Sequence, residues 1–209
     1  MRKGFFVTIE GCEGVGKSTL LRGLKDYLET AGRDAVFTRE PGGTEVAERI
    51  RAVILDPENA AMTPTAELLL YAAARAQHTE EKIIPAVRDG KLVICDRYSD
   101  STLAYQSYAR GLDRGECLAA DEIARRGIKP DLTVFLDLSP ERGFARKGGA
   151  DKSDRLEREK IDFHERVYAG FRAIAESEPD RVVAVDASKS KEEVLAAVVN
   201  LLKERGMTD

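Results

Sequence analysis

Short, nearly continuous apolar runs alternate along this chain with longer stretches whose apolar residues recur at helical spacing. Runs without polar alternation are typical of strands buried on both faces of a parallel sheet. The expected strands span residues 5–9, 35–38, 92–95, 132–138 and 182–185. Strands that alternate with helices predict an α/β fold of three layers, in which helices flank a five-stranded parallel sheet.

The segments between these runs have the pattern of amphipathic helices. Val46, Ile50 and Val53 fall on one face of such a helix, which should end at Asp56-Pro57. Ser139, followed by a proline and a glutamate, is a favourable helix start. The expected helices span residues 19–28, 44–55, 65–79, 80–88 (interrupted at Pro85), 100–109, 116–126, a segment from 139, 155–177 and 191–205.

Composition limits the class of protein. A chain of 209 residues with 43% hydrophobic and 33% charged residues predicts one globular domain, residues 1–209. The net charge of −4 gives no electrostatic footprint for a nucleic-acid polymer or an anionic membrane. No apolar run approaches the 18 or more residues of a membrane span, so we expect no membrane association.

Cysteine and histidine usage points away from disulfide and metal-cluster chemistry. Cys12, Cys95 and Cys117 are odd in number and lack paired spacing, which favours a reducing cytoplasm. His78 and His164 are far apart and form no metal-ligand pattern, so we interpret both as ordinary helix-face residues.

Residues 11–18, with the sequence GCEGVGKS, fit the phosphate-loop pattern G-x-x-x-x-G-K-[ST]. An expected strand precedes the loop and an expected helix follows it, so the helix N-terminus would face the bound anion. Lys17 would reach the β- and γ-phosphates, and the Ser18 hydroxyl would bind Mg²⁺. The residues expected to bind ATP are Gly11, Cys12, Glu13, Gly14, Val15, Gly16, Lys17, Ser18 and Thr19.

Further candidate residues follow the other strands. Asp96 and Arg97 come directly after the strand at 92–95, where ligands of such sheets bind. Arg97 is suited to a phosphate, and Asp96 could hold Mg²⁺ through water or orient Arg97; a structural ion pair is the alternative. Tyr71 and Arg75, four residues apart, share a helix face and could bind a nucleobase, or they could be a core tyrosine and a surface arginine.

The segment 146–154 is polar, basic and rich in glycine. It could be a mobile lid that closes over the phosphates or a plain solvated loop. GTPase motifs are missing: the chain has neither an Asn-Lys-x-Asp nor an Asp-x-x-Gly run, so a Ras-like switch is not expected.

Over nearly its full length the chain resembles the thymidylate kinase family. The segments that carry the resemblance are 9–19 (IEGCEGVGKST), 38–44 (TREPGGT), 70–75 (LYAAAR), 96–106 (DRYSDSTLAYQ), 129–132 (KPDL), 154–157 (DRLE) and 185–187 (VDA). The resemblance implies a phosphate-loop kinase, dependent on ATP and Mg²⁺, that phosphorylates dTMP to dTDP for dTTP synthesis, and it implies a homodimer. Helices around 67–70 or 103–108 could form the dimer contact.

The resemblance also implies roles for single residues. Tyr71 would stack on thymine, Arg75 would bond a thymine carbonyl, and Gln106 would meet the ring N3, with Thr102 near the base. Tyr105 would exclude a ribose 2′-hydroxyl. Two further contacts involve the sugar and the phosphate: Glu13 would meet the 3′-hydroxyl, and Arg51 and Arg97 would hold the dTMP phosphate.

Family members place an additional catalytic cation either in the phosphate loop or in the lid. Gly14 leaves this loop without an extra arginine, which resembles the bacterial lid-type arrangement. The lid offers Arg146, Lys147 and Lys152, of which we favour Arg146 as catalytic beside Lys17 and Arg97. Ala150 stands where lid-type relatives often carry a further arginine.

Two other functions remain open at this level. A deoxynucleoside kinase would phosphorylate a sugar hydroxyl and would need a carboxylate base. A nucleotide-dependent switch or assembly ATPase would hydrolyse ATP without a small acceptor.

Overall fold

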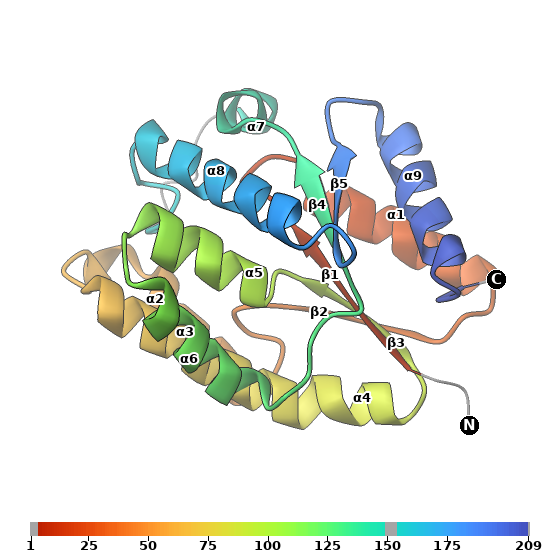
Figure 1. The fold of residues 1–209 in the computed structure, drawn as a ribbon, viewed down its shortest axis with the longest axis horizontal. Helices are drawn as coiled ribbons and strands as arrows, with labels where there is room; N and C mark the ends of the chain where they lie inside the picture. The colour runs from red at the N-terminus through yellow and green to blue at the C-terminus, as the bar shows by residue number, and fades with distance from the viewer. Residues whose placement is uncertain (1–3, 149–153, 209) are drawn as a thin grey trace.

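Five parallel strands form one sheet in the order β2-β3-β1-β4-β5 (Figure 1). The computed structural model describes residues 4–148 and 154–208. The strands are β1 (Phe5–Glu10), β2 (Ala35–Arg39), β3 (Leu92–Asp96), β4 (Leu132–Asp137) and β5 (Val182–Asp186). Each expected strand is present within one residue of its expected end, and the predicted parallel sheet flanked by helices is confirmed.

Helices cover both faces of the sheet. Val7 and Ile9 face α1 (Lys17–Thr30), which packs against α9 (Lys191–Glu204) on the same side. Phe6 and Thr8 point to the opposite face, because successive strand residues alternate in direction. That face is covered by α3 (Pro64–His78), η2 (Thr79–Ile83), α4 (Ile84–Arg88), α5 (Ser99–Thr102), η3 (Leu103–Ala109) and α8 (Ile161–Ser177).

The remaining helices lie at the periphery. They are α2 (Glu45–Leu55) and α6 (Arg114–Arg125), which pack on α3, the short 3₁₀ turn η1 (Pro57–Asn59), and α7 (Pro140–Lys147), which packs on α8. None of the described helices has the length and apolar character needed to cross a bilayer.

Two expected helices differ from the structure. The helix expected at 155–177 begins only at Ile161, because the backbone N–H of Arg155 donates to the carbonyl of Leu55 and its side chain is buried. Residues 155–158 form turns in its place, with a bend on either side. Helical structure continues from residue 64 to residue 88 without a break at Pro85. The segment η2 just before Pro85 is a π-helical turn, and its altered hydrogen bonding accommodates a residue that has no N–H to donate.

Two glycines allow the phosphate loop to touch α7. A Cβ atom on Gly14 would lie 2.1 Å from the carbonyl oxygen of Gly143, and one on Gly143 would lie 2.2 Å from the carbonyl oxygen of Glu13. Neither position can accept a side chain without separating the two segments. Gly14 also has a φ of 71°, in the left-handed region that favours glycine.

Glu10 connects the end of β1 to the start of α5. Its carboxyl group accepts from the backbone N–H of Tyr98 at 2.7 Å and from the Ser101 hydroxyl at 2.6 Å. The side chain is fully buried. Burial, helped by the nearby Asp100 carboxylate, raises the pKa of Glu10 to about 7, although Arg97 opposes the shift.

We expect this carboxyl group to make stability depend on pH. The unfolded chain loses the proton near the ordinary pKa of 4.5 and the folded protein keeps it to about 7, so the free energy of unfolding should fall as pH rises through this range. Glu10→Gln, which cannot ionise, should remove about 3 kcal/mol of that fall, at roughly 1.4 kcal/mol for each pKa unit. Denaturant unfolding of both proteins between pH 5 and 8 measures the difference; a difference constant with pH would contradict the expectation.

Candidate active site

A cavity of about 870 Å³ opens at the carboxyl ends of the strands. The phosphate loop follows β1, Glu40 follows β2, Asp96 ends β3 and Ala187 follows β5, and all of them line the cavity. The sequence-derived candidates in its lining are Glu13, Gly14, Val15, Gly16, Lys17, Ser18, Thr19, Arg51, Tyr71, Asp96, Arg97, Thr102, Tyr105, Gln106, Arg146 and Lys147. Gly11, Cys12 and Arg75 are the candidates that lie outside the lining.

The phosphate loop encloses the ammonium group of Lys17. Its Nζ donates to the carbonyl oxygens of Gly11 at 3.0 Å and Cys12 at 2.8 Å, so these two residues contribute backbone from behind the lining. Burial, together with the neighbouring Arg97, lowers the pKa of Lys17. Gly16 has a φ of 103° and is the N-cap residue of α1, so the loop leads directly into a helix N-terminus.

Arg97 joins the end of β3 to the phosphate loop. Its φ of 68° is unusual for a residue with a side chain, and strained backbone is common at functional sites. Its guanidinium donates to the Glu13 carboxylate and to the Ser101 hydroxyl, the latter at 3.4 Å, and lies 5.1 Å from the ring centre of Tyr105. Burial would raise the pKa of Glu13, but Lys17, Arg97 and Lys147 outweigh it and lower this pKa to about 2.

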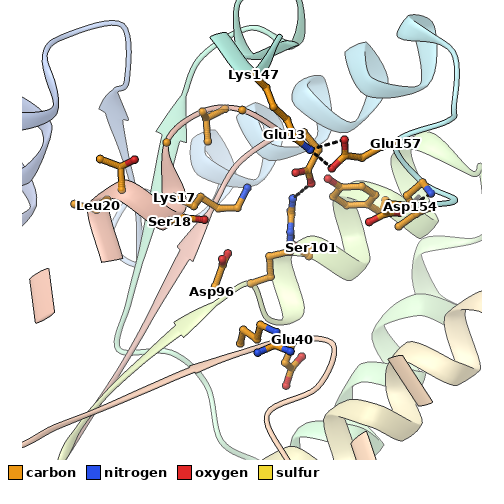
Figure 2. Close-up of a pocket in the computed structure, with 18 of the residues that line it drawn as sticks. Glu13, Lys17, Ser18, Leu20, Glu40, Asp96, Ser101, Lys147, Asp154 and Glu157 are labelled. Carbon is orange, nitrogen blue, oxygen red and sulfur yellow. Dashed lines mark hydrogen bonds and ion pairs between the residues drawn. The ribbon is translucent and has the colours of Figure 1, made fainter. Parts of the chain in front are cut away.

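Ser18 and Asp96 provide oxygen atoms near Lys17 (Figure 2). The Oδ1 atom of Asp96 is buried and has no hydrogen-bond partner within residues 4–148 and 154–208. Hydroxyl and carboxylate oxygens are the ligands that Mg²⁺ prefers, usually with several waters retained. The two residues therefore fit a magnesium ion held beside the phosphate loop.

A second group of residues forms the end of the cavity between α3 and η3. Tyr71 comes from α3, and Thr102, Tyr105 and Gln106 come from α5 and η3. The hydroxyl of Tyr105 is buried and has no partner in the described part of the chain. An aromatic ring beside unsatisfied polar groups is typical of a site for a planar polar ligand.

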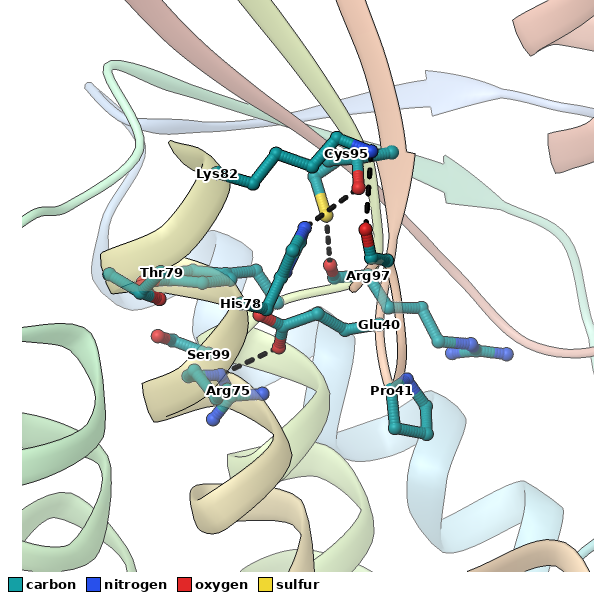
Figure 3. Close-up of polar contacts among 12 residues, drawn as sticks. Glu40, Pro41, Arg75, His78, Thr79, Lys82, Cys95, Arg97 and Ser99 are labelled. Atoms are coloured by element: carbon teal, nitrogen blue, oxygen red, sulfur yellow. Dashed lines mark hydrogen bonds and ion pairs between the residues drawn. The ribbon is translucent and has the colours of Figure 1, made fainter. Parts of the chain in front are cut away.

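Arg75 lies behind this end of the cavity, with only 2% of its surface exposed. Its Nε donates to Glu40 at 2.8 Å (Figure 3). Its Nη1 donates to the Thr102 hydroxyl at 2.7 Å and to Asp121 at 2.8 Å. His78 is also buried and bonds the other Glu40 oxygen at 2.9 Å.

The sequence indicates Arg75 but not the cluster around it. His78, expected as an ordinary helix-face residue, is buried and contacts Glu40 through Nδ1 and Thr38 through Nε2. The available signal was the spacing of Arg75 and His78, which are three residues apart and therefore share a helix face with Tyr71.

Two of the basic residues expected in a lid lie on α7. Arg146 and Lys147 lie in its last turn. Arg146 donates to the carbonyl oxygens of Ala187 at 2.6 Å and Ser188 at 3.1 Å, and Lys147 pairs with the Glu157 carboxylate (Figure 2). Lys152 and Ala150 lie outside the described residues.

Comparison with known proteins gives a consistent result. The family model described as thymidylate kinase matches residues 9–198. A thymidylate kinase of Halalkalibacterium halodurans is 44% identical over 207 residues, covering 98% of this chain and 99% of the relative. Thymidylate kinases of a Synechococcus strain and of Geobacter sulfurreducens are 48% and 45% identical, each with at least 96% of both chains covered. The chain therefore belongs to the thymidylate kinase family.

Proposed function

We propose that this protein transfers the γ-phosphoryl group of ATP to dTMP, giving ADP and dTDP for the synthesis of dTTP. The observation that carries this proposal is a single cavity that joins a complete phosphate loop to an aromatic and amide-lined end. The family and its relatives support dTMP as the acceptor.

The phosphate loop would bind the donor. Backbone N–H groups of residues 11–19 surround the phosphates of ATP, and Lys17 leaves its carbonyl partners to contact the β- and γ-phosphates. Ser18 and Asp96 would hold Mg²⁺, which supplies positive charge that neutralises the phosphate oxygens when bound. Arg146, from the end of α7, is the cation that we propose acts in catalysis with Lys17 and Arg97.

The acceptor phosphate would lie between Arg51 and Arg97. Arg51 is positioned by donating to the carbonyl oxygen of Pro41 at 2.8 Å, and Arg97 by its contact with Glu13. A phosphate monoester is already anionic at neutral pH, so no strong general base is needed. Catalysis then consists of positioning the two phosphates and neutralising their charge.

The remaining residues would read the nucleoside. Tyr71 stacks on thymine and Gln106 meets its N3–H, with Thr102 beside the base. Arg75 bonds a thymine carbonyl from its position behind Thr102. Glu13 meets the 3′-hydroxyl of the sugar, and the ring of Tyr105 fills the space that a 2′-hydroxyl would need.

We also propose a homodimer and a cytoplasmic location. Exposed apolar side chains lie on α2, α3 and α6, which pack side by side; they include Val53, Leu69 and Ile123. Of the segments suggested by sequence, Leu69 and Tyr108 are exposed, whereas Glu67 and Leu68 are buried. Three free cysteines agree with a reducing compartment.

A panel of acceptors tests the reaction. We expect ADP release with Mg²⁺ and ATP to require dTMP and to be negligible with thymidine. Activity with thymidine but not dTMP would instead indicate a deoxynucleoside kinase. ADP release that does not depend on any acceptor would indicate an ATPase.

The role of Arg75 can be separated from its structural ion pairs. Arg75→Lys keeps the charge beside Glu40 but loses the planar fork, so we expect KM for dTMP to rise by about tenfold or more while KM for ATP changes less than about twofold. Arg181→Lys is the matched control, because Arg181 forms a similar pair with the buried Asp100 away from the cavity. Equal effects on both substrates, or the same rise in the control, would refute the base-reading role.

Tyr105 provides a test of sugar selection. If the bulk of its ring excludes the 2′-hydroxyl, Tyr105→Phe should keep the preference for dTMP over its ribonucleotide, and Tyr105→Ala should reduce it by about tenfold or more. The ratio of kcat/KM values for the two nucleotides measures this. An alanine variant that still rejects the ribonucleotide would show that another group makes the selection.

A further inference from the structure

Glu67 is a buried carboxylate in the first turns of α3, with 1% of its surface exposed. It does not line the cavity, and both of its oxygens are engaged by neighbouring side chains. Nevertheless, it lies four residues before Tyr71 on the same helix, and therefore on the face that Tyr71 presents to the cavity.

Each oxygen of the Glu67 carboxylate accepts hydrogen bonds from two nitrogen atoms. Gln106 Nε2 donates to Oε1 at 3.0 Å and Arg110 Nε to the same oxygen at 3.1 Å. Arg110 Nη2 donates to Oε2 at 3.1 Å, and Arg155 Nη2 donates to that oxygen as well. Burial opposes ionisation, but these hydrogen bonds outweigh it and lower the pKa of Glu67, so the carboxylate is charged at neutral pH.

This environment determines which way the Gln106 amide points. An ionised carboxylate only accepts hydrogen bonds, so the amide nitrogen of Gln106 must face Glu67. Rotating the amide by half a turn would place its oxygen against the Glu67 oxygen and lose the bond at 3.0 Å. The amide oxygen of Gln106 therefore remains for the cavity, and no donor to it exists among the described residues.

We propose that Glu67 is a positioning residue that makes Gln106 an acceptor and thereby selects pyrimidines that carry an N3–H. This inference rests on the proposed function, because it assumes that the base lies against Gln106. Thymine and uracil donate from N3, whereas the N3 of cytosine is an acceptor and would meet the Gln106 oxygen without a hydrogen. A fixed acceptor thus favours one class of base by pairing and disfavours the other by leaving buried polar groups unpaired.

The experiment compares dTMP with 5-methyl-dCMP, which has the same sugar, phosphate and methyl group and differs only at N3 and C4. Glu67→Gln can offer either an oxygen or a nitrogen to Gln106, so the amide is free to turn. We expect the ratio of kcat/KM values for dTMP and 5-methyl-dCMP to fall by about tenfold, the factor associated with one misdirected hydrogen bond in a buried site. Both values come from one sample, so a loss of folded protein cancels from the ratio.

Two further variants isolate the contact. Glu159→Gln removes another carboxylate that pairs with Arg110 but has no bond to Gln106, and it should leave the ratio within about twofold. In a Gln106→Met background, Glu67→Gln should change the ratio less than about twofold, because the amide that it orients is gone.

The outcomes separate this inference from the function on which it rests. A wild-type protein that phosphorylates dTMP, with an unchanged ratio in Glu67→Gln, overturns the positioning role alone. An equal fall in Glu159→Gln also overturns it, since that would be a general effect of charge. Glu67→Asp, which keeps the charge but shortens the reach to Gln106, should lower the ratio in the same way and replaces Glu67→Gln if that variant does not fold. A wild type inactive with dTMP would refute the proposed function itself.

Discussion

The parallel pairing of β1 with β3 is the constraint on which the site depends. Ile9 pairs with Asp96 in the register of the two strands, and the backbone N–H of Arg97 donates to the carbonyl of Ile9 at 3.0 Å. The two strands end at the same level of the sheet, so the phosphate loop after β1 and Arg97 after β3 lie side by side. A shift of one residue would turn every side chain of the strand to the opposite face and would move Asp96 away from Ser18.

Buried ion pairs behind the cavity orient side chains that line it. Arg75 with Glu40 and Glu67 with Arg110 are both largely buried ion pairs. Such pairs contribute little net stability, because removing two charges from water offsets most of their attraction. Here these pairs fix side-chain orientation. A buried charge with all its hydrogen-bond partners has one orientation, and the hydroxyl or amide group that bonds to it is fixed as well.

The sequence is most informative where a local pattern determines both structure and chemistry. Strand limits follow from short apolar runs, and the phosphate loop follows from residue types whose spacing is set by the anion that they surround. Contacts between distant segments leave no such pattern. Nothing local indicates that Arg155 folds back on Leu55 and delays the helix until Ile161, or that Arg75 is enclosed by Glu40 and Asp121. Glu67 resembles any helix-surface glutamate until Gln106 and Arg110 are placed against it.

The contact between Gly14 and Gly143 restricts how this enzyme could change over time. A catalytic cation cannot be transferred from the lid into the loop by one substitution at position 14, because its first carbon would collide with the backbone of α7. Moving α7 away would in turn displace Arg146, the cation that we propose acts in catalysis. With Arg146 in that proposed role, an intermediate would lose one charge before gaining the other, so the contact acts as a barrier between the two arrangements.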